Sequence, residues 1–315
     1  MTSIADQQMP LITRLIAANL KIADKSAACV QRIFQNGNLK IEDKGGLKNY
    51  QTEADTKIEQ LLRGNIEKHF PDITIIGEEG EVGKIELEED WIDYQSSLVN
   101  FQKEFGENLK NVPSDSEINA KDLVIWLDPL DGTAEFIDGL LSHVTTLIGI
   151  AHKGKPIAGI INQPFFKNPD GSMGRSIWGI VGVGAFGFRR QDQKSGRILT
   201  TSRSHVTPMV QECLDAISPT EILKMGGAGN KVLQLIENNA HAYLFASRYT
   251  KKWDTCAPEA VLLALGGKLT DVHGNVLEYH ADVQQENKAG VVAAVENIDF
   301  YLGAIPQSIK DKLPP

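Results

Sequence analysis

The sequence predicts a layered α/β protein whose first sheet is largely antiparallel. Three observations support this fold class. Apolar residues recur at helical spacing through the first 70 residues. Strand-like runs joined by turn residues fill the middle of the chain, and helices and strands alternate after residue 200.

Length and composition limit the classes of protein to consider. The chain has 315 residues, 42% hydrophobic and 23% charged, which is ordinary for a globular protein with one large or two medium domains. No apolar run approaches the ~20 residues that a membrane span needs. The N-terminus lacks a basic-then-apolar signal, and Cys29, Cys213 and Cys256 are too widely spaced to suggest a disulfide framework or a zinc site. We therefore expect a cytoplasmic protein that does not bind membranes.

The net charge of −9 argues against binding of nucleic-acid polymers, which relies on a basic surface. The same charge would oppose a phosphorylated substrate unless the acidic residues cluster and hold cations. A bound metal ion reverses the sign of the local field. The arrangement of the acidic residues is therefore the decisive question.

The N-terminal part of the chain predicts two helices and a strand. Helical spacing covers residues 9–34 and, more regularly, residues 52–70, where Pro71 ends the pattern. The β-branched run at residues 73–76 predicts a short strand.

Residues 80–121 are acid-rich, most densely at residues 86–90, and partly helical around residues 98–105. A charged run of this kind is usually a solvated face. We expect a surface segment without a chemical role.

The middle of the chain predicts strands. A continuous apolar run at residues 123–127 suits a buried strand. Two hairpins follow, formed by residues 144–151 with 157–161 and by residues 177–183 with 185–189.

The C-terminal part predicts alternating elements. Helices are expected near residues 208–217, 230–236, 258–265 and 299–312, and strands near residues 222, 242–246, 268 and 290. The change of pattern near residue 195 predicts two domains, residues 1–195 and residues 196–315.

The strongest motif is Asp-Pro-Leu-Asp-Gly-Thr at residues 128–133. A buried strand delivers Asp128 at its end, and the proline and glycine favour a tight turn that points Asp128 and Asp131 into one small space. Carboxylates with a free carbonyl are ligands that Mg²⁺ prefers, and the amides of Gly132 and Thr133 can face a phosphate. A plain turn is the alternative, but two aspartates after a buried strand favour a metal site.

Three other acidic motifs are weaker when taken alone. Glu78 and Glu79 follow a predicted strand, as acidic pairs on surfaces commonly do. Asp254 is also explained as the cap of a helix with Pro258 in its first turn. A Thr-x-x-Asp sequence ending at Asp55 resembles a capping box, which is its favoured interpretation.

Two glycine-rich segments need separate interpretations. Residues 226–231 (Gly-Gly-Ala-Gly-Asn-Lys) lead into a helix, so they suit an anion or ribose-phosphate contact or simply a helix start. Residues 182–187 fit G-x-G-x-x-G but continue as strand, which favours a hairpin over a dinucleotide site. No H-E-x-x-H or G-x-S-x-G sequence is present, so zinc and serine hydrolysis are unsupported.

Taken together in chain order, Asp55, Glu78, residues 128–133 and Asp254 resemble the signature of the lithium-sensitive, magnesium-dependent phosphatases that include inositol monophosphatase. The resemblance covers nearly the whole chain and is closest to the 3′(2′),5′-bisphosphate nucleotidases. It implies a five-layer αβαβα sandwich of the inositol monophosphatase and fructose-1,6-bisphosphatase type, with the site between the two halves.

The resemblance also implies two to three Mg²⁺ ions and inhibition by Li⁺. One ion would bind Glu78, Asp128 and the carbonyl of Leu130. A second would bind Asp128, Asp131 and Asp254, and a third would lie near Glu78, mostly through water. Most of these ligands belong to residues 1–195.

The same resemblance assigns catalytic and substrate-binding roles. Asp55 and Thr133 would deprotonate the attacking water, while Glu79 is a weaker candidate for a metal ligand. The residues expected to contact substrate are Gly132, Thr133, Ser202, His205, Gly227, Lys231 and Asp254.

The implied substrate is a small phosphorylated molecule, 3′-phosphoadenosine 5′-phosphate, whose 3′-phosphate would be removed to leave AMP. The sulfated nucleotide, 3′-phosphoadenylyl sulfate, is a possible second substrate. An inositol polyphosphate 1-phosphatase acting on inositol 1,4-bisphosphate shares the metal motifs and stays as the alternative. A catalytically inactive relative is less favoured, because every expected position is intact.

Overall fold

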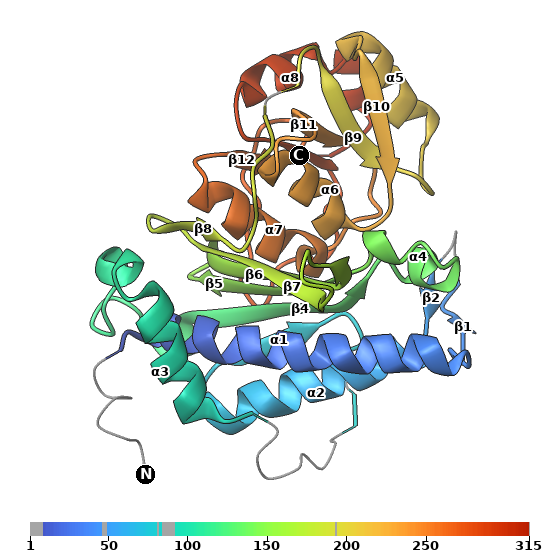
Figure 1. Ribbon diagram of the computed structural model, residues 1–315. Coiled ribbons are helices and arrows are strands. Elements are labelled where there is room, and N and C mark those ends of the chain that lie inside the picture. The colour runs from blue at the N-terminus through green and yellow to red at the C-terminus, as the bar shows by residue number, and fades with distance from the viewer. Residues whose placement is uncertain (1–8, 46–48, 81, 84–91, 193, 315) are drawn as a thin grey trace.

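The computed structural model describes residues 9–45, 49–80, 82–83, 92–192 and 194–314. Its elements stack as alternating layers of helices and sheets (Figure 1). The acidic run at residues 86–90, for which no chemical role is predicted, lies outside the described residues.

The helices and strands have the following bounds. The α-helices described are α1 Leu11–Asn36, α2 Glu53–His69, α3 Tyr94–Phe105, α4 Thr133–Ile137, α5 Pro208–Ile217, α6 Ala228–Ile236, α7 Lys252–Ala264, α8 Ile298–Ala304 and α9 Gln307–Lys310. The strands described are β1 Glu42–Asp43, β2 Tyr50–Gln51, β3 Thr74–Gly77, β4 Leu123–Asp131, β5 Thr145–His152, β6 Lys155–Lys167, β7 Met173–Ile180, β8 Gly184–Phe186, β9 Ile198–Ser202, β10 Glu221–Met225, β11 Ala242–Phe245, β12 Lys268–Thr270 and β13 Val291–Ala294.

The first large sheet has the order β3-β4-β5-β6-β7-β8. Only β3 and β4 run parallel, and every later neighbour is antiparallel. The prediction of a largely antiparallel first sheet is thus confirmed, as are both predicted hairpins, β5–β6 and β7–β8. The G-x-G-x-x-G sequence lies in the second hairpin, so no βαβ unit surrounds it.

The second large sheet has the order β10-β9-β11-β13-β12. Strands β10, β9 and β11 are parallel, whereas β13 is antiparallel to both of its neighbours. This mixture follows from the alternation of helices and strands after residue 200, because a helical crossover returns the chain in the same direction.

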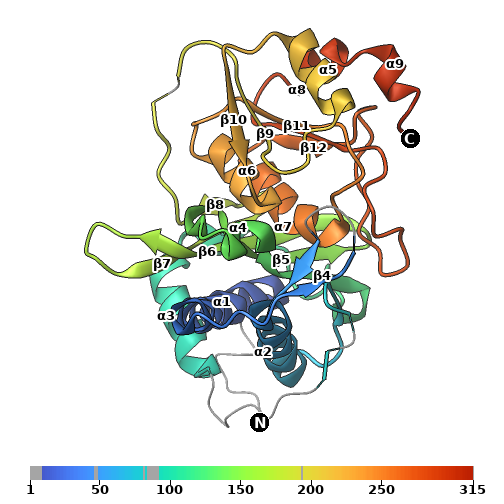
Figure 2. The same ribbon diagram turned by 90° about the vertical axis from the view of Figure 1, so that its right-hand side faces the viewer.

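Helices cover both sheets and separate them. Helices α1 and α2 pack on the outer face of the first sheet, α6 and α7 lie between the sheets, and α5 and α8 cover the outer face of the second (Figures 1 and 2). This is the expected five-layer αβαβα arrangement. None of the described helices is long and apolar enough to span a bilayer.

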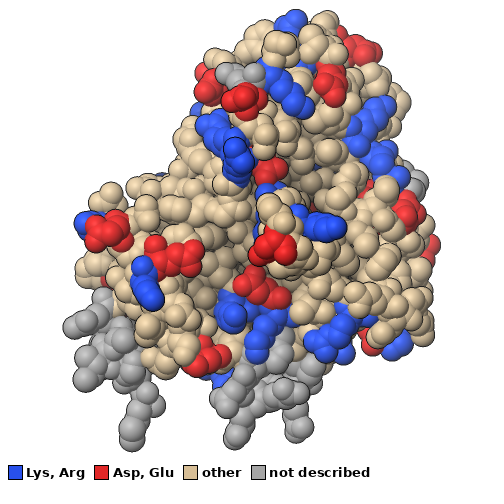
Figure 3. All heavy atoms as spheres, in the orientation of Figure 1, with Lys and Arg blue, Asp and Glu red and all other residues tan. Residues whose placement is uncertain are grey.

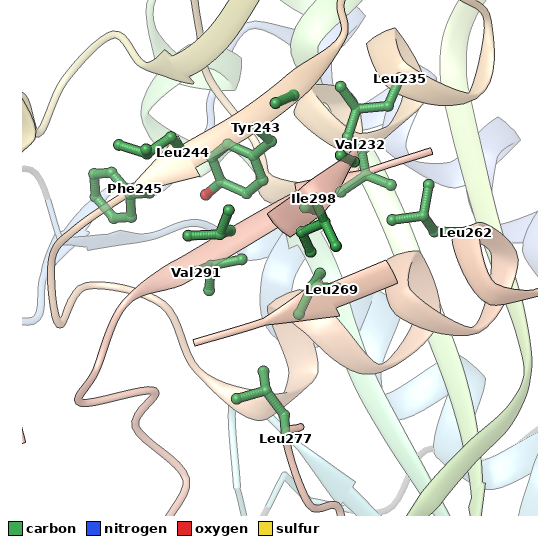
Figure 4. Close-up of a cluster of buried hydrophobic side chains, with 14 of the residues drawn as sticks. Val232, Leu235, Tyr243, Leu244, Phe245, Leu262, Leu269, Leu277, Val291 and Ile298 are labelled. Carbon is green, nitrogen blue, oxygen red and sulfur yellow. The ribbon is translucent and has the colours of Figure 1, made fainter. Parts of the chain in front are cut away.

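The apolar residues form two buried clusters, one on each side of the first sheet. The larger one joins the sheets. Figure 4 shows Tyr243 and Phe245 of β11 with Val232 of α6, Leu262 of α7 and Val291 of β13. Burying each apolar side chain of this size contributes about 1.5–3 kcal/mol to stability. Because α6 and α7 bury such side chains against both sheets, packing on both of their faces fixes these helices.

Three predicted elements differ from the structure. Strand β4 does not end at Leu127 but continues through the acidic motif to Asp131. Helix α7 begins at Lys252 rather than near Pro258, which lies inside the helix and not in its first turn. The predicted final helix is two short helices, since Pro306 cannot supply the N–H that a continuous helix needs.

Candidate active site

The acidic motif lies on an irregular strand end. Asp128 is opposite Leu147 of β5 and Asp131 is opposite Thr145, so two residues of β4 between these pairs face one residue of β5 and form a bulge. The Leu130 amide donates to Asp128 Oδ1 (3.1 Å), which fixes the bulge. The predicted tight turn is therefore a bulge within the strand, followed by Gly132 at φ +91°, from which α4 begins.

The Asp131 carboxylate binds the N-terminus of α6. It accepts hydrogen bonds from the Ala228 and Gly229 amides (2.7 and 2.8 Å) and from the Thr145 hydroxyl (2.6 Å). Gly227 has φ +71°, and a Cβ there would come within 2.9 Å of Asp131 Oδ2. The glycine-rich loop starts helix α6, as one interpretation predicts, and its amides bind the Asp131 carboxylate; a contact with a ribose-phosphate stays a prediction.

Asp254 lies in the first turn of α7. Its Oδ2 accepts a hydrogen bond from the Lys251 amide (2.6 Å), so it caps the helix as one sequence interpretation proposed. Oxygen atoms of Asp128, Asp131 and Asp254 also lie within 4.8 Å of one another. Asp254 can cap the helix and belong to the acidic cluster at the same time, because a carboxylate has two oxygens.

The carboxyl groups of this cluster and of the neighbouring Glu78 are costly to ionise together. Burial raises the pKa of Glu78, Asp128, Asp131 and Asp254, to about 7 for Asp254, and repulsion between carboxylates adds to the rise at Glu78, Asp128 and Asp254. Divalent cations would offset both effects. Buried carboxylate oxygens beside a backbone carbonyl are a donor set that fits Mg²⁺.

Asp55 and Thr133 are directly joined. The Thr133 hydroxyl lies 3.0 Å from Asp55 Oδ1 and 3.1 Å from the Leu130 carbonyl, and its single proton can be donated to one of them at a time. Asp55 Oδ2 accepts hydrogen bonds from the Thr52 amide and hydroxyl (2.7 and 2.6 Å). The predicted capping box is thus confirmed, and burial raises the pKa of Asp55 to about 6.

One pocket collects most of the predicted residues. Those that line it are Glu78, Asp128, Leu130, Asp131, Gly132, Thr133, Ser202, His205, Gly227, Lys231 and Asp254. Asp55 reaches the pocket only through Thr133. The contributing segments come from β4, α6 and α7 and from the ends of β3 and β9, so the pocket lies where the two sheets meet the central helices.

Glu79 is separated from this pocket. Its carboxylate forms an ion pair with Lys44 (2.6 Å) and accepts a hydrogen bond from Gln51, while its amide donates to Glu59 Oε2 (2.8 Å). Among the described residues, Glu79 therefore has partners in the β1–β2 hairpin and α2, and direct metal binding by this residue stays a prediction.

Three of the predicted substrate residues, Ser202, His205 and Lys231, have partners that also line the pocket. The Ser202 hydroxyl accepts hydrogen bonds from the Ser204 and His205 amides (3.2 and 3.1 Å). The His205 ring lies 4.6 Å from the ring of Tyr249, which is 51% exposed. Lys231 Nζ donates to the Gly227 carbonyl (2.6 Å), and burial lowers its pKa.

Sequence reasoning missed three residues at this site. Thr145 bonds Asp131, Tyr249 completes the aromatic pair, and Glu135 accepts a hydrogen bond from Arg203 Nε (3.2 Å) across the pocket edge. A threonine inside the apolar run of β5 was the one available signal, because a buried hydroxyl needs a partner. Tyr249 and Glu135 gave no signal, since their neighbours come from distant segments.

The chain matches the model of the inositol monophosphatase family over residues 12–300. It belongs to that family. Human 3′(2′),5′-bisphosphate nucleotidase 1 is 46% identical over 311 residues, covering 97% of this chain and 98% of that protein. The Dictyostelium discoideum protein of the same name is 41% identical over 305 residues, covering 92% and 96%.

The family fold is also found among solved structures. The extragenic suppressor protein suhB from Bartonella henselae superposes with a TM-score of 0.68 at 19% identity, covering 93% of this chain and 98% of that one. At this identity the likeness shows the fold alone.

Proposed function

We propose that this protein is a magnesium-dependent phosphomonoesterase that removes the 3′-phosphate of 3′-phosphoadenosine 5′-phosphate, with 3′-phosphoadenylyl sulfate as a second substrate. The relatives named as bisphosphate nucleotidases align along nearly the whole chain at 41–46% identity. The observation that favours a nucleotide over an inositol phosphate as substrate is the pair of rings, His205 and Tyr249, that lines the pocket. Aromatic faces can stack on a nucleotide base.

Glu78, Asp128, Asp131, Asp254 and the Leu130 carbonyl would hold two to three Mg²⁺ ions. When bound, such ions supply Lewis-acid chemistry, neutralising phosphate charge and acidifying water. The residues around them hold the phosphate at the entrance of α4, where the Gly132 and Thr133 amides face it.

Thr133 and Asp55 act as the base. With its proton donated to Asp55, the Thr133 hydroxyl presents a lone pair that accepts a hydrogen bond from the attacking water. Asp55 then receives the proton through that hydroxyl, which general base catalysis requires. No covalent intermediate on the protein is needed. Lys231, Ser202 and His205 orient the rest of the nucleotide.

Phosphate release from two compounds tests the choice of substrate. At equal concentration and saturating Mg²⁺, 3′-phosphoadenosine 5′-phosphate should give the higher kcat/KM, with AMP as the nucleotide product. Inositol 1,4-bisphosphate should be slower, and a higher kcat/KM for it would overturn the nucleotide assignment. Binding of the nucleotide without phosphate release would indicate an inactive relative. Repeating the assay with increasing LiCl tests lithium inhibition. A rate of phosphate release that does not change with LiCl would exclude it.

A further inference from the structure

The entry into helix α7 is held by a strip of chain far away in sequence. Residues 285–287 belong to the long connection between β12 and β13 and lie along residues 250–252. The Lys252 amide donates to the Gln285 carbonyl (2.8 Å), and the Asn287 amide donates to the Thr250 carbonyl (2.9 Å). The strip therefore lies beside the helix turn that carries Asp254.

Asn287 is the buried member of this strip, with 3% of its surface exposed. Its Nδ2 donates to the Lys251 carbonyl (2.9 Å) and lies 3.3 Å from the hydroxyl oxygens of Thr250 and Thr255. An amide nitrogen has two protons for these three acceptors, and the shortest contact is the one to Lys251.

Lys251 is thereby fixed at both ends of its backbone. Its carbonyl accepts from Asn287 and from the Thr255 hydroxyl (3.2 Å), while its amide donates to Asp254 Oδ2 (2.6 Å). One residue thus connects the Asn287 side chain to the Asp254 carboxylate.

The side-chain carbonyl oxygen of Asn287 makes no comparable contact. Its Oδ1 is buried and finds no hydrogen-bond partner among the described residues. Leaving a buried acceptor unpaired is unfavourable, and an apolar side chain of similar volume would avoid that penalty. The amide is therefore explained by its donor group alone.

We propose that Asn287 is a positioning residue for Asp254, fixing through Lys251 the orientation in which that carboxylate faces the metal site. The inference rests on the proposed function, in which Asp254 holds Mg²⁺. Residues that hold a metal ligand in place commonly change metal affinity by roughly 10–100-fold when substituted.

The test compares Asn287→Leu with Asn275→Leu as a matched control. Asn275 lies in the same connection and donates through Nδ2 to Asp271 Oδ2 (2.9 Å), and among the described residues it makes no hydrogen bond to α7. Isothermal titration with MgCl₂, without substrate, should give a dissociation constant roughly tenfold or more higher for Asn287→Leu and unchanged for Asn275→Leu. At saturating Mg²⁺, most of kcat and the substrate KM should return.

Combining Asn287→Leu with Asp254→Asn separates positioning from general loosening. If Asn287 acts through Asp254, the losses in Mg²⁺ affinity are not additive. Unchanged affinity in Asn287→Leu, or fully additive losses, would overturn the inference. If Asn287→Leu does not fold, Thr255→Val decides, because it removes the other side-chain donor to the Lys251 carbonyl and should raise the Mg²⁺ dissociation constant several-fold.

The two proposals fail differently. A wild-type protein that neither binds Mg²⁺ nor releases phosphate contradicts the proposed function. A wild-type protein that does both, with Asn287→Leu binding Mg²⁺ equally well, contradicts only the role of Asn287.

Discussion

Asp131 combines two tasks that are usually divided between residues. Its carboxylate belongs to the acidic cluster and also accepts both amide hydrogen bonds at the start of α6. The helix dipole favours a negative charge at that position, which partly compensates the burial of the carboxylate. The start of α6 and the proposed metal site therefore depend on the same side chain.

Asp131→Asn should lower kcat by roughly a hundredfold or more, because a fixed charge at the reacting phosphate is lost. It should also cost about 1 kcal/mol, because the new amide group cannot accept from both α6 amides. Phosphate release and urea unfolding measure the two effects. Asp170→Asn, in the exposed β6–β7 turn, is the control and should keep wild-type turnover. Near-wild-type activity in Asp131→Asn would contradict the metal assignment.

Thr133→Val keeps the shape of the side chain and removes the hydroxyl that contacts Asp55 and that, in the proposed function, accepts a hydrogen bond from the attacking water. We expect kcat to fall by about 10²–10⁴, the usual contribution of a positioned base, with little change in KM. Thr133→Ser should restore much of kcat. Steady-state kinetics at saturating Mg²⁺ decide the matter, and equal kcat in the valine and serine variants would exclude the hydroxyl relay.

Local patterns recognised Asp55 and Asp254, favouring a cap alone for Asp55 and leaving both a cap and a metal ligand open for Asp254. Asp55 and Asp254 were explained as helix caps, and both do accept capping hydrogen bonds. Their free oxygens additionally face Thr133 and the acidic cluster. The family resemblance implied the second role of each residue, and the positions of distant segments show the contacts behind it.

At the scale of elements, the loop before α6 is the most tightly constrained. Gly226 lies against Glu135 of α4, and a Cβ on Gly226 would come within 1.9 Å of Glu135 Cδ. Glu135 is itself held by Arg203, which also pairs with Asp138 (2.6 Å). The pocket edge is thus set by contacts between α4, the β9–α5 turn and the α6 loop.

Gly226→Ala should therefore displace Glu135, raise the substrate KM and destabilise the fold by about 1–3 kcal/mol, the usual cost of overpacking. Gly303→Ala is the matched control, since nothing lies within 4 Å of a Cβ at that helical position. It should be neutral or slightly stabilising. Thermal unfolding and kinetics of both variants provide the measurement, and equal stabilities would contradict the packing argument.

Element boundaries depended on contacts that the sequence does not display. The start of α7 lies well before Pro258 because the strip at residues 285–287 and Asp254 fix the chain from Thr250 onwards. Strand β4 extends past Leu127 because β5 pairs with it through the bulge. A pattern of apolar residues stops at the first polar residues. The hydrogen bonds between two strands can continue past them, so the strand extends further than the pattern predicts.

At the scale of the whole molecule, the negative charge is not spread as a uniform field. Figure 3 shows Lys and Arg interspersed with Asp and Glu over one face, with no continuous area of either sign. Two carboxylates of the proposed metal site, Asp128 and Asp131, are instead buried inside the protein. The predicted boundary near residue 195 stays a prediction; it falls between β8, which ends at Phe186, and β9, which begins at Ile198.

A buried acid in the central helix layer makes global stability depend on pH. Burial raises the pKa of Glu259 to about 8, although Tyr279 donates a hydrogen bond to it and Lys252 is near. Between pH ~5 and 8 the folded protein thus holds a proton on Glu259 that the unfolded chain releases. Stability then falls as pH rises, by at most ~1.4 kcal/mol per pH unit from this group, and levels off above pH 8.

Glu259→Gln should remove that slope, because an amide does not titrate. The stability advantage of the variant over wild type should grow from pH 5.5 to pH 8 and then stay constant. Urea unfolding at four pH values, with saturating MgCl₂ throughout, measures this difference while contributions shared by both proteins cancel. If the free energies of unfolding of the two proteins changed equally with pH, Glu259 would not titrate in this range.

The sequence by itself determined the layered α/β class, the largely antiparallel first sheet and the acidic segment at residues 128–133, because hydrophobic periodicity and turn residues are local signals. Through the resemblance it also gave the family. The tertiary structure alone decided that Asp131 caps α6, that Thr145 donates to Asp131, and that Asn287 holds the turn carrying Asp254. These contacts join residues 14 or more positions apart, and only the pairing of strands and the packing of helices between two sheets bring such residues within hydrogen-bond distance.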